Sequence, residues 1–180
     1  MDHSHALQMA SRTDAGMVRS HNEDAVFSNA VLGLAILADG MGGYNAGEVA
    51  SGMATTLLGS ELEKAFQKTA PHQLDASGKL YSHSVLEAEI ARANTAIYQA
   101  AQSQPQYAGM GTTLVVTLFY DNMMTVAHIG DSRLYRLRGD EFHAVTRDHS
   151  LLQEQIDSGM ITADEARHSQ NKNLVTRALG

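Results

Sequence analysis

Cysteine is absent from this 180-residue sequence, and its absence excludes several kinds of chemistry. Without thiols the chain has no disulfide framework, no thiolate zinc site and no cysteine nucleophile, so thiol-based phosphatase mechanisms are excluded. The lack of cysteine is also compatible with a reducing cytosol.

Long apolar runs and clusters of positive charge are absent as well. No apolar stretch approaches the ~20 residues that span a bilayer, and the first residues lack the basic-then-apolar pattern of a signal peptide. The net charge of −7, with no Lys/Arg cluster, argues against nucleic acid or an anionic membrane as a partner. We therefore expect a soluble cytoplasmic protein. Its 43% hydrophobic and 18% charged residues are typical of one globular domain, residues 1–180.

An apolar run at residues 31–38 ends in an acidic residue, Asp39, and three glycines follow within four positions (Gly40, Gly42 and Gly43). This pattern predicts a buried strand that delivers a carboxylate to a glycine loop, before a helix that begins at Ala46. A carboxylate beside bare backbone suits a hard cation with oxygen ligands. An ordinary strand–loop–helix corner is the alternative.

Short strands are predicted at residues 7–13 and 24–28, and the connection between them carries charged residues. Arg19 offers a planar fork of donors that matches phosphate, and the adjacent carboxylates of Glu23 and Asp24 suit a metal or its waters. Solvated loop charges are the alternative for each.

Helical spacing of apolar residues predicts amphipathic helices at residues 46–67 and 84–102, joined by a surface connection. Residues 112–120, 123–129, 133–137 and 141–145 have the β-branched composition and turn spacing of a four-stranded meander. Capping boxes at Ser150 and Thr162 then predict two short helices, the first ended by Gly159, as an excursion from the sheet.

A second aspartate, Asp131, follows a predicted strand beside a glycine. Four acidic groups would gather at one end of the sheet only if a divalent cation offset their repulsion, namely Glu23, Asp24, Asp39 and Asp131. Residues 109–113 are rejected as a nucleotide-binding P-loop, because they lack the Lys-Ser/Thr pair and lead into a strand.

The sequence resembles the metal-dependent serine/threonine protein phosphatases of the type 2C class, in their compact bacterial form. Five ordered motifs across about residues 9–180 carry the resemblance: Thr13-Asp14-x-Gly16-x-Val18-Arg19-x-x-Asn22-Glu23-Asp24, Asp39-Gly40-Met41-Gly42-Gly43 with Ala46-Gly47-Glu48-x-Ala50-Ser51, Met110-Gly111-Thr112-Thr113, His128-x-Gly130-Asp131-Ser132-Arg133, and Thr176-Arg177-Ala178-Leu179-Gly180.

This resemblance implies an α+β fold, an αββα sandwich of two antiparallel sheets flanked by helices, with two or three Mn²⁺ or Mg²⁺ ions at one end. It implies that Asp39 bridges two metals and that Arg19 holds the substrate phosphate. The remaining implied metal ligands are Glu23, Asp24, the carbonyl of Gly40, and Asp131 for a third ion.

The implied activity is hydrolysis of phosphoserine and phosphothreonine by a metal-bridging water, without a covalent enzyme intermediate. The implied partners are phosphorylated proteins, the products of a serine/threonine kinase. The excursion at residues 148–173 corresponds to the family's flap, which lies beside the site and affects substrate choice.

The sequence departs from the family pattern in two respects. Met41 and Tyr44 occupy positions where relatives carry a histidine, so a side-chain general acid is not identified. The chain also stops at Gly180, before two further metal-ligand aspartates of the family, so we expect a fold that is incomplete at its C-terminus. A catalytically incomplete fragment or a non-enzymatic phosphoprotein-binding lobe is therefore the alternative to an active phosphatase.

Overall fold

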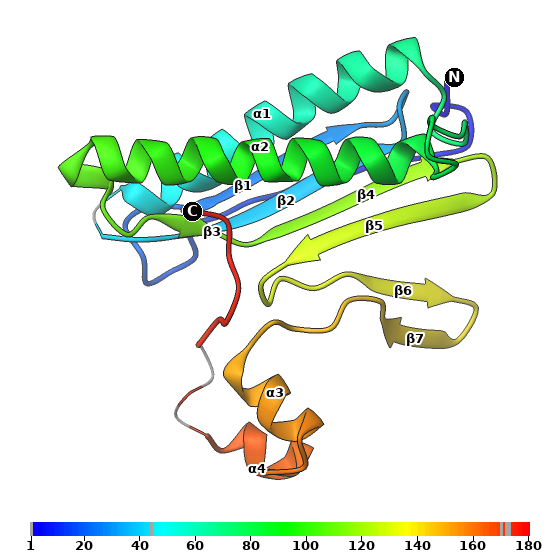
Figure 1. Ribbon diagram of the computed structural model, residues 1–180. Coiled ribbons are helices and arrows are strands. Elements are labelled where there is room, and N and C mark those ends of the chain that lie inside the picture. The colour runs from blue at the N-terminus through cyan, green and yellow to red at the C-terminus, as the bar shows by residue number, and fades with distance from the viewer. Residues whose placement is uncertain (1, 44, 170, 172–173) are drawn as a thin grey trace.

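The computed structural model describes residues 2–43, 45–169, 171 and 174–180. Its main feature is an antiparallel sheet in the order β1-β2-β4-β5, with β3 paired to the end of β2. The strands are β1 (Asp24–Asn29), β2 (Leu34–Met41), β3 (Gly111–Thr112), β4 (Leu114–Tyr120) and β5 (Met123–Ile129). Helices α1 (Ala46–Lys68) and α2 (Tyr81–Ser103) cover one face of this sheet (Figure 1).

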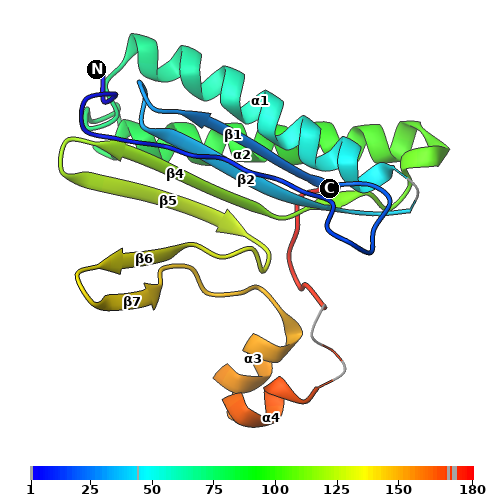
Figure 2. The ribbon, with the colours of Figure 1, turned by 180° about the vertical axis from the view of Figure 1, so that it is seen from behind.

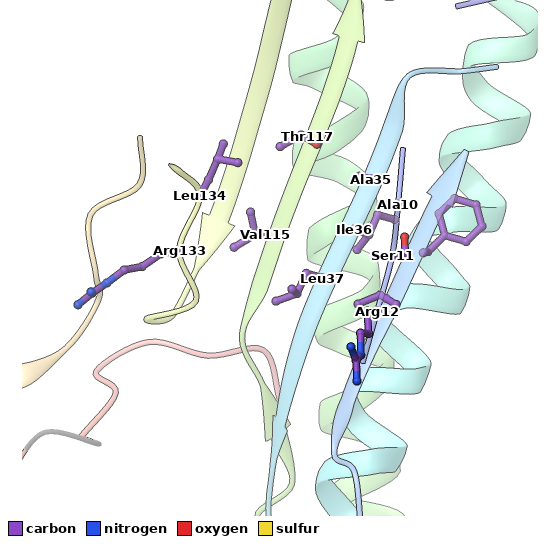
Figure 3. A pocket seen from close by; sticks show the side chains of 12 residues that line it. Ala10, Ser11, Arg12, Ala35, Ile36, Leu37, Val115, Thr117, Arg133 and Leu134 are labelled. Atoms are coloured by element: carbon purple, nitrogen blue, oxygen red, sulfur yellow. The ribbon is translucent and has the colours of Figure 1, made fainter. Parts of the chain in front are cut away.

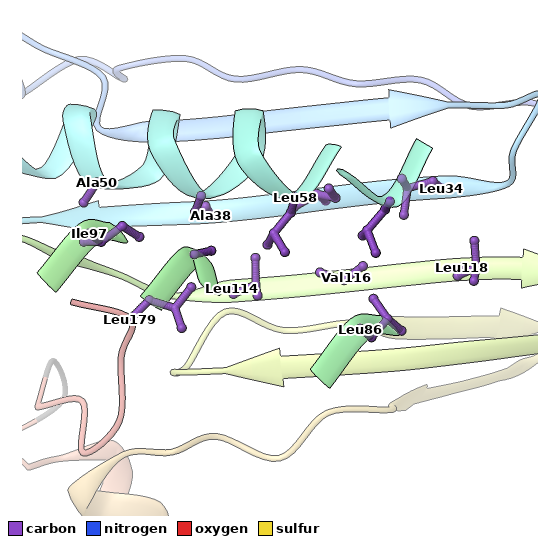
Figure 4. Packing of buried hydrophobic residues seen from close by; sticks show 14 of the residues in the cluster. Leu34, Ala38, Ala50, Leu58, Leu86, Ile97, Leu114, Val116, Leu118 and Leu179 are labelled. Atoms are coloured by element: carbon purple, nitrogen blue, oxygen red, sulfur yellow. The ribbon is translucent and has the colours of Figure 1, made fainter. Parts of the chain in front are cut away.

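The core lies between the sheet and these two helices. Alternate residues of β2 and β4 face the helices, as the period of a strand requires, and Leu58 of α1 lies against them (Figure 4). Leu62, one helical turn further along α1, belongs to the same buried cluster. Burying each such leucine contributes about 1.5–3 kcal/mol. This packing fixes the position of β2, the strand that carries Asp39.

The opposite face of the sheet carries a shallow groove of about 250 Å³. Leu37 and Val115 lie on its floor, and residues 10–12 and Leu134 border it (Figure 3). Beyond it lies a two-stranded sheet of β6 (Tyr135–Arg138) and β7 (Glu141–Ala144), visible from behind in Figure 2. The α+β class with two antiparallel sheets and flanking helices is thus confirmed.

Three strand predictions need correction. Residues 7–13 are not a strand, because their backbone joins no ladder and Ser11 contacts Ser28 only through side-chain hydroxyls. The meander is divided, because β6 pairs with β7 and not with β5. The loop expected after Asp39 begins later, because Gly40 and Met41 stay in β2 by pairing with β3.

The helix predictions were closer. Helix α1 matches the predicted range to within one residue, whereas α2 begins at Tyr81, earlier than predicted, because no side-chain cap marks its start. Short helices α3 (Leu151–Asp157) and α4 (Ala163–Arg167) begin at the predicted caps Ser150 and Thr162. No helix in the described part of the chain combines the length and hydropathy needed to cross a membrane.

Candidate metal and phosphate site

Asp24 and Asp39 stand opposite each other at one end of the main sheet. They are direct register partners in the antiparallel β1–β2 ladder, which places their carboxyl groups within hydrogen-bonding reach. Asn22 holds the start of β1 by accepting the backbone N–H of Asp24 at 3.1 Å. The ladder thus brings together two of the four acidic residues that the sequence predicted to gather at one end of the sheet.

Burial and the repulsion between carboxylates in this cluster raise the pKa of Asp39. Partial desolvation, followed by the carboxylates of Asp24 and Asp131, raises this pKa to about 6, and the nearby Arg19 guanidinium opposes the rise. Carboxylates held at such close range favour a bound cation, which lowers their mutual repulsion. The residues present therefore fit a divalent metal in their chemistry.

The described residues contain no group of three His, Asp or Glu side chains that could hold a metal ion by themselves. Asp24 and Asp39 form a pair, Asp131 acts on Asp39 from the end of β5, and the Glu23 carboxylate faces Arg19. This chain consequently offers part of a coordination shell.

Arg19 lies beside the carboxylates and remains open to solvent. Its Nη1 donates to Oε2 of Glu23 at 3.2 Å, and its side chain is 69% exposed whereas that of Glu23 is 18% exposed. Because this contact uses only part of the guanidinium, Arg19 keeps donors available for an anion such as phosphate.

The backbone around Glu23 and Gly40 is packed too closely for larger residues. The carbonyl of Glu23 accepts the N–H of Gly40 at 3.0 Å and the hydroxyl of Ser51 at 2.6 Å. A Cβ atom on Gly47 would lie 2.6 Å from the Glu23 carboxylate and 2.9 Å from the carbonyl carbon of Gly40. The N-terminal turn of α1 therefore presses directly on the predicted ligands.

Two hydroxyl residues that the sequence did not single out fix the backbone of Asp39. Its N–H donates to the hydroxyl of Thr113 at 3.1 Å, and its carbonyl accepts the hydroxyl of Thr112 at 3.0 Å. The Thr113 hydroxyl also bonds that of Ser132 at 2.7 Å, next to Asp131. These threonines belong to the segment rejected as a P-loop, and the only sequence signal for them was their place in a family motif.

Met41 and Tyr44 are the two positions at which relatives carry a histidine. Met41 is the last residue of β2 and has no ionisable group. Tyr44 lies outside the described residues.

The family model described as "Protein phosphatase 2C" matches residues 13–175. Protein phosphatase PhpP of Streptococcus pneumoniae is 40% identical over 177 residues, which are 97% of this chain and 68% of that protein.

Solved structures agree with the sequence match. The crystal structure of the Mycobacterium tuberculosis serine/threonine phosphatase PstP/Ppp is similar with a TM-score of 0.81 and 38% identity, over 94% of this chain and 66% of that one. The catalytic domain of PstP in complex with two manganese ions is similar with a TM-score of 0.76 and 38% identity, over 94% of this chain and 65% of that one. The chain thus spans about two thirds of these relatives.

Proposed function

Because this chain belongs to the protein phosphatase 2C family of serine/threonine phosphatases, we propose that this protein hydrolyses phosphoserine and phosphothreonine in proteins with divalent metal ions. The observation that carries the proposal is the convergence of Asp24, Asp39 and Asp131 beside an exposed Arg19. Its substrates are proposed to be phosphorylated proteins, the products of a serine/threonine kinase. A cytoplasmic location stays a prediction from the sequence.

The proposed metal ligands are the residues expected from the sequence: Glu23, Asp24, Asp39, the Gly40 carbonyl and Asp131. Support comes from the clustered carboxylates and from the two manganese ions of the similar PstP domain. We propose Mn²⁺ or Mg²⁺, in two or three positions. Bound cations of this kind lower the pKa of a coordinated water and stabilise charge on phosphate oxygens.

The chain's own residues orient the reaction. Asp39 is fixed at its backbone by Thr112 and Thr113, so its carboxylate has a defined direction at the end of β2. Arg19 is proposed to bind the phosphate group, because a guanidinium matches phosphate oxygens with two parallel donors. No observation favours the alternative of a non-enzymatic phosphoprotein-binding lobe.

Chelation of divalent metal is expected to abolish phosphatase activity, because the carboxylate cluster cannot activate water without a cation. The measurement is release of phosphate from a phosphothreonine peptide by the purified protein in EDTA, before and after an excess of Mn²⁺ is added. Equal turnover in excess chelator would refute the metal-dependent mechanism.

Replacing Arg19 with alanine is expected to raise the KM for a phosphopeptide about tenfold with a smaller change in kcat, because the guanidinium meets a phosphate already charged in the ground state. Arg12→Ala is the matched control, since Arg12 is also an exposed arginine near an acidic residue, Asp14. Equal KM values for the two variants would remove Arg19 from the phosphate site.

A further inference from the structure

We infer that His149 is a positioning residue, which fixes the segment of helices α3 and α4 against the strand end that carries Asp131. This segment, residues 150–169, is called the α3–α4 arm below. The consequence for substrate binding rests on the proposed phosphatase function, whereas the consequence for the arm itself does not.

His149 forms a two-point contact with Gly130. Its backbone N–H donates to the Gly130 carbonyl at 2.9 Å, and its ring Nδ1 accepts the Gly130 N–H at 3.1 Å. Gly130 has a φ of +101°, and a Cβ there would lie 2.6 Å from the Thr113 side chain. Only glycine therefore presents both backbone groups to His149 in this way, one residue before Asp131.

The ring of His149 also stacks on that of His128 from β5, with centroids 4.8 Å apart and planes 10° from parallel. His128 Nε2 lies 2.8 Å from the Arg147 carbonyl, so this nitrogen is the donor. Nδ1 of His149 is an acceptor, so the neutral ring carries its proton on Nε2. The end of β5 thus contacts residues 147–149, which lead directly into the arm.

The far end of the arm returns to the same residue. The carbonyl of His149 accepts the N–H of Thr176 at 2.8 Å, and the next residue, Ser150, forms a bridge with Val175. Both views of the whole chain show residues 174–180 ending at the main sheet (Figures 1 and 2), where Leu179 forms a bridge with Thr112. His149 therefore joins three segments: the end of β5, the start of the arm and its return.

The side-chain bond is the part of this junction that a substitution can remove. Arg133 and Asp148 provide a second connection, a charge-assisted pair with Nε–Oδ1 and Nη2–Oδ2 distances of 2.8 and 2.6 Å. The Asp148 carboxylate accepts from Arg133, two residues beyond Asp131, and makes no bond to Gly130. The N–H of Gly130 donates to the ring of His149 instead. Gly130 is buried, so losing that acceptor leaves an unpaired amide.

The experiment compares His149→Phe with His149→Asn. Phenylalanine keeps an aromatic ring but accepts no hydrogen bond, whereas asparagine keeps an oxygen near the position of Nδ1. Amide hydrogen exchange of residues 150–169 is measured in the purified protein, and we expect about tenfold faster exchange in His149→Phe and rates near wild type in His149→Asn. His143→Phe, at an exposed position of β7, is the matched control.

A second measurement separates this inference from the proposed function. For His149→Phe we expect the KM for a phosphothreonine peptide to rise about tenfold, with a smaller change for a small aryl phosphate, which has no peptide part to contact the arm. If the wild-type protein proves inactive, the proposed function fails and hydrogen exchange still tests the role of His149.

Two outcomes would overturn the inference. Unchanged exchange in His149→Phe would mean that the remaining contacts, among them the Arg133–Asp148 pair, fix the arm without the ring of His149. Equal acceleration in His149→Phe and His149→Asn would mean that ring packing, and not the bond to Gly130, holds the junction.

Discussion

Asp39→Asn is expected to lower kcat/KM for a phosphothreonine peptide by about a thousandfold or more, because the variant loses the charge proposed to bridge two metal ions. The affinity for Mn²⁺, measured by titration calorimetry, should decrease as well. Asp140→Asn makes the same chemical change in the exposed β6–β7 turn and should leave both quantities unchanged. Wild-type Mn²⁺ affinity in Asp39→Asn would show that the assignment of Asp39 is wrong.

Asp39→Asn should lower activity but raise the stability of the metal-free protein. Asp39 has a pKa of about 6, above its ordinary 3.8, so its contribution to metal-free stability is greatest below pH 4 and is lost as the pH rises through 6. Its side chain is partly exposed, so solvent screening reduces the cost of the ionised form to about 1 kcal/mol. In mildly alkaline, metal-free buffer, Asp39→Asn should therefore melt a few degrees above wild type. A variant that had merely misfolded would lose both activity and stability.

Gly47→Ala is expected to destabilise the protein by about 3 kcal/mol and to weaken Mn²⁺ binding, because the added methyl group has no space. Its Cβ would lie 2.6 Å from the Glu23 carboxylate and 2.9 Å from the Gly40 carbonyl carbon, which is backbone held in a sheet. Thermal unfolding and calorimetry measure the two effects.

The control for this variant lies on the same helix. A Cβ on Gly52 would meet no atom within 4 Å, so Gly52→Ala should stabilise α1 by about 0.5–1 kcal/mol, through helix propensity alone. If both alanine variants were equally stable, close packing of α1 on the predicted metal ligands would not constrain residue 47.

Much of the fold follows from patterns within short stretches of the sequence. Helix α1 was predicted because Leu58 and Leu62 repeat at helical spacing, and the caps of α3 and α4 are local hydrogen bonds. The strand predicted at residues 7–13 was wrong. A strand needs a neighbouring strand to pair with, and the local sequence pattern does not reveal whether that neighbour is present. The break between β3 and β4 was missed because residues 112–120 are rich in β-branched residues and contain no turn residue. In the structure the Thr113 hydroxyl accepts the backbone N–H of Asp39 at this break.

The site divides in the same way. The acidic residues at strand ends could be recognised in the sequence as candidate metal ligands, and the sheet brings Asp24, Asp39 and Asp131 together. Their metal-binding roles remain predictions. The supporting bonds of Thr113 and His149 could not be found from the sequence, because the role of a hydroxyl or an imidazole depends on which backbone amide it faces.

The pairing that closes the α3–α4 arm affects which changes of length the arm can tolerate. Ser150, the first residue of the arm, pairs with Val175, so this pairing closes a loop that contains the arm. The entropy of closing a loop grows slowly with length, by about 0.6 kcal/mol for each doubling. Insertions and deletions within the arm therefore cost little and leave Asp39 and its neighbours in place. The length and sequence of the arm can therefore change without disturbing the carboxylate cluster.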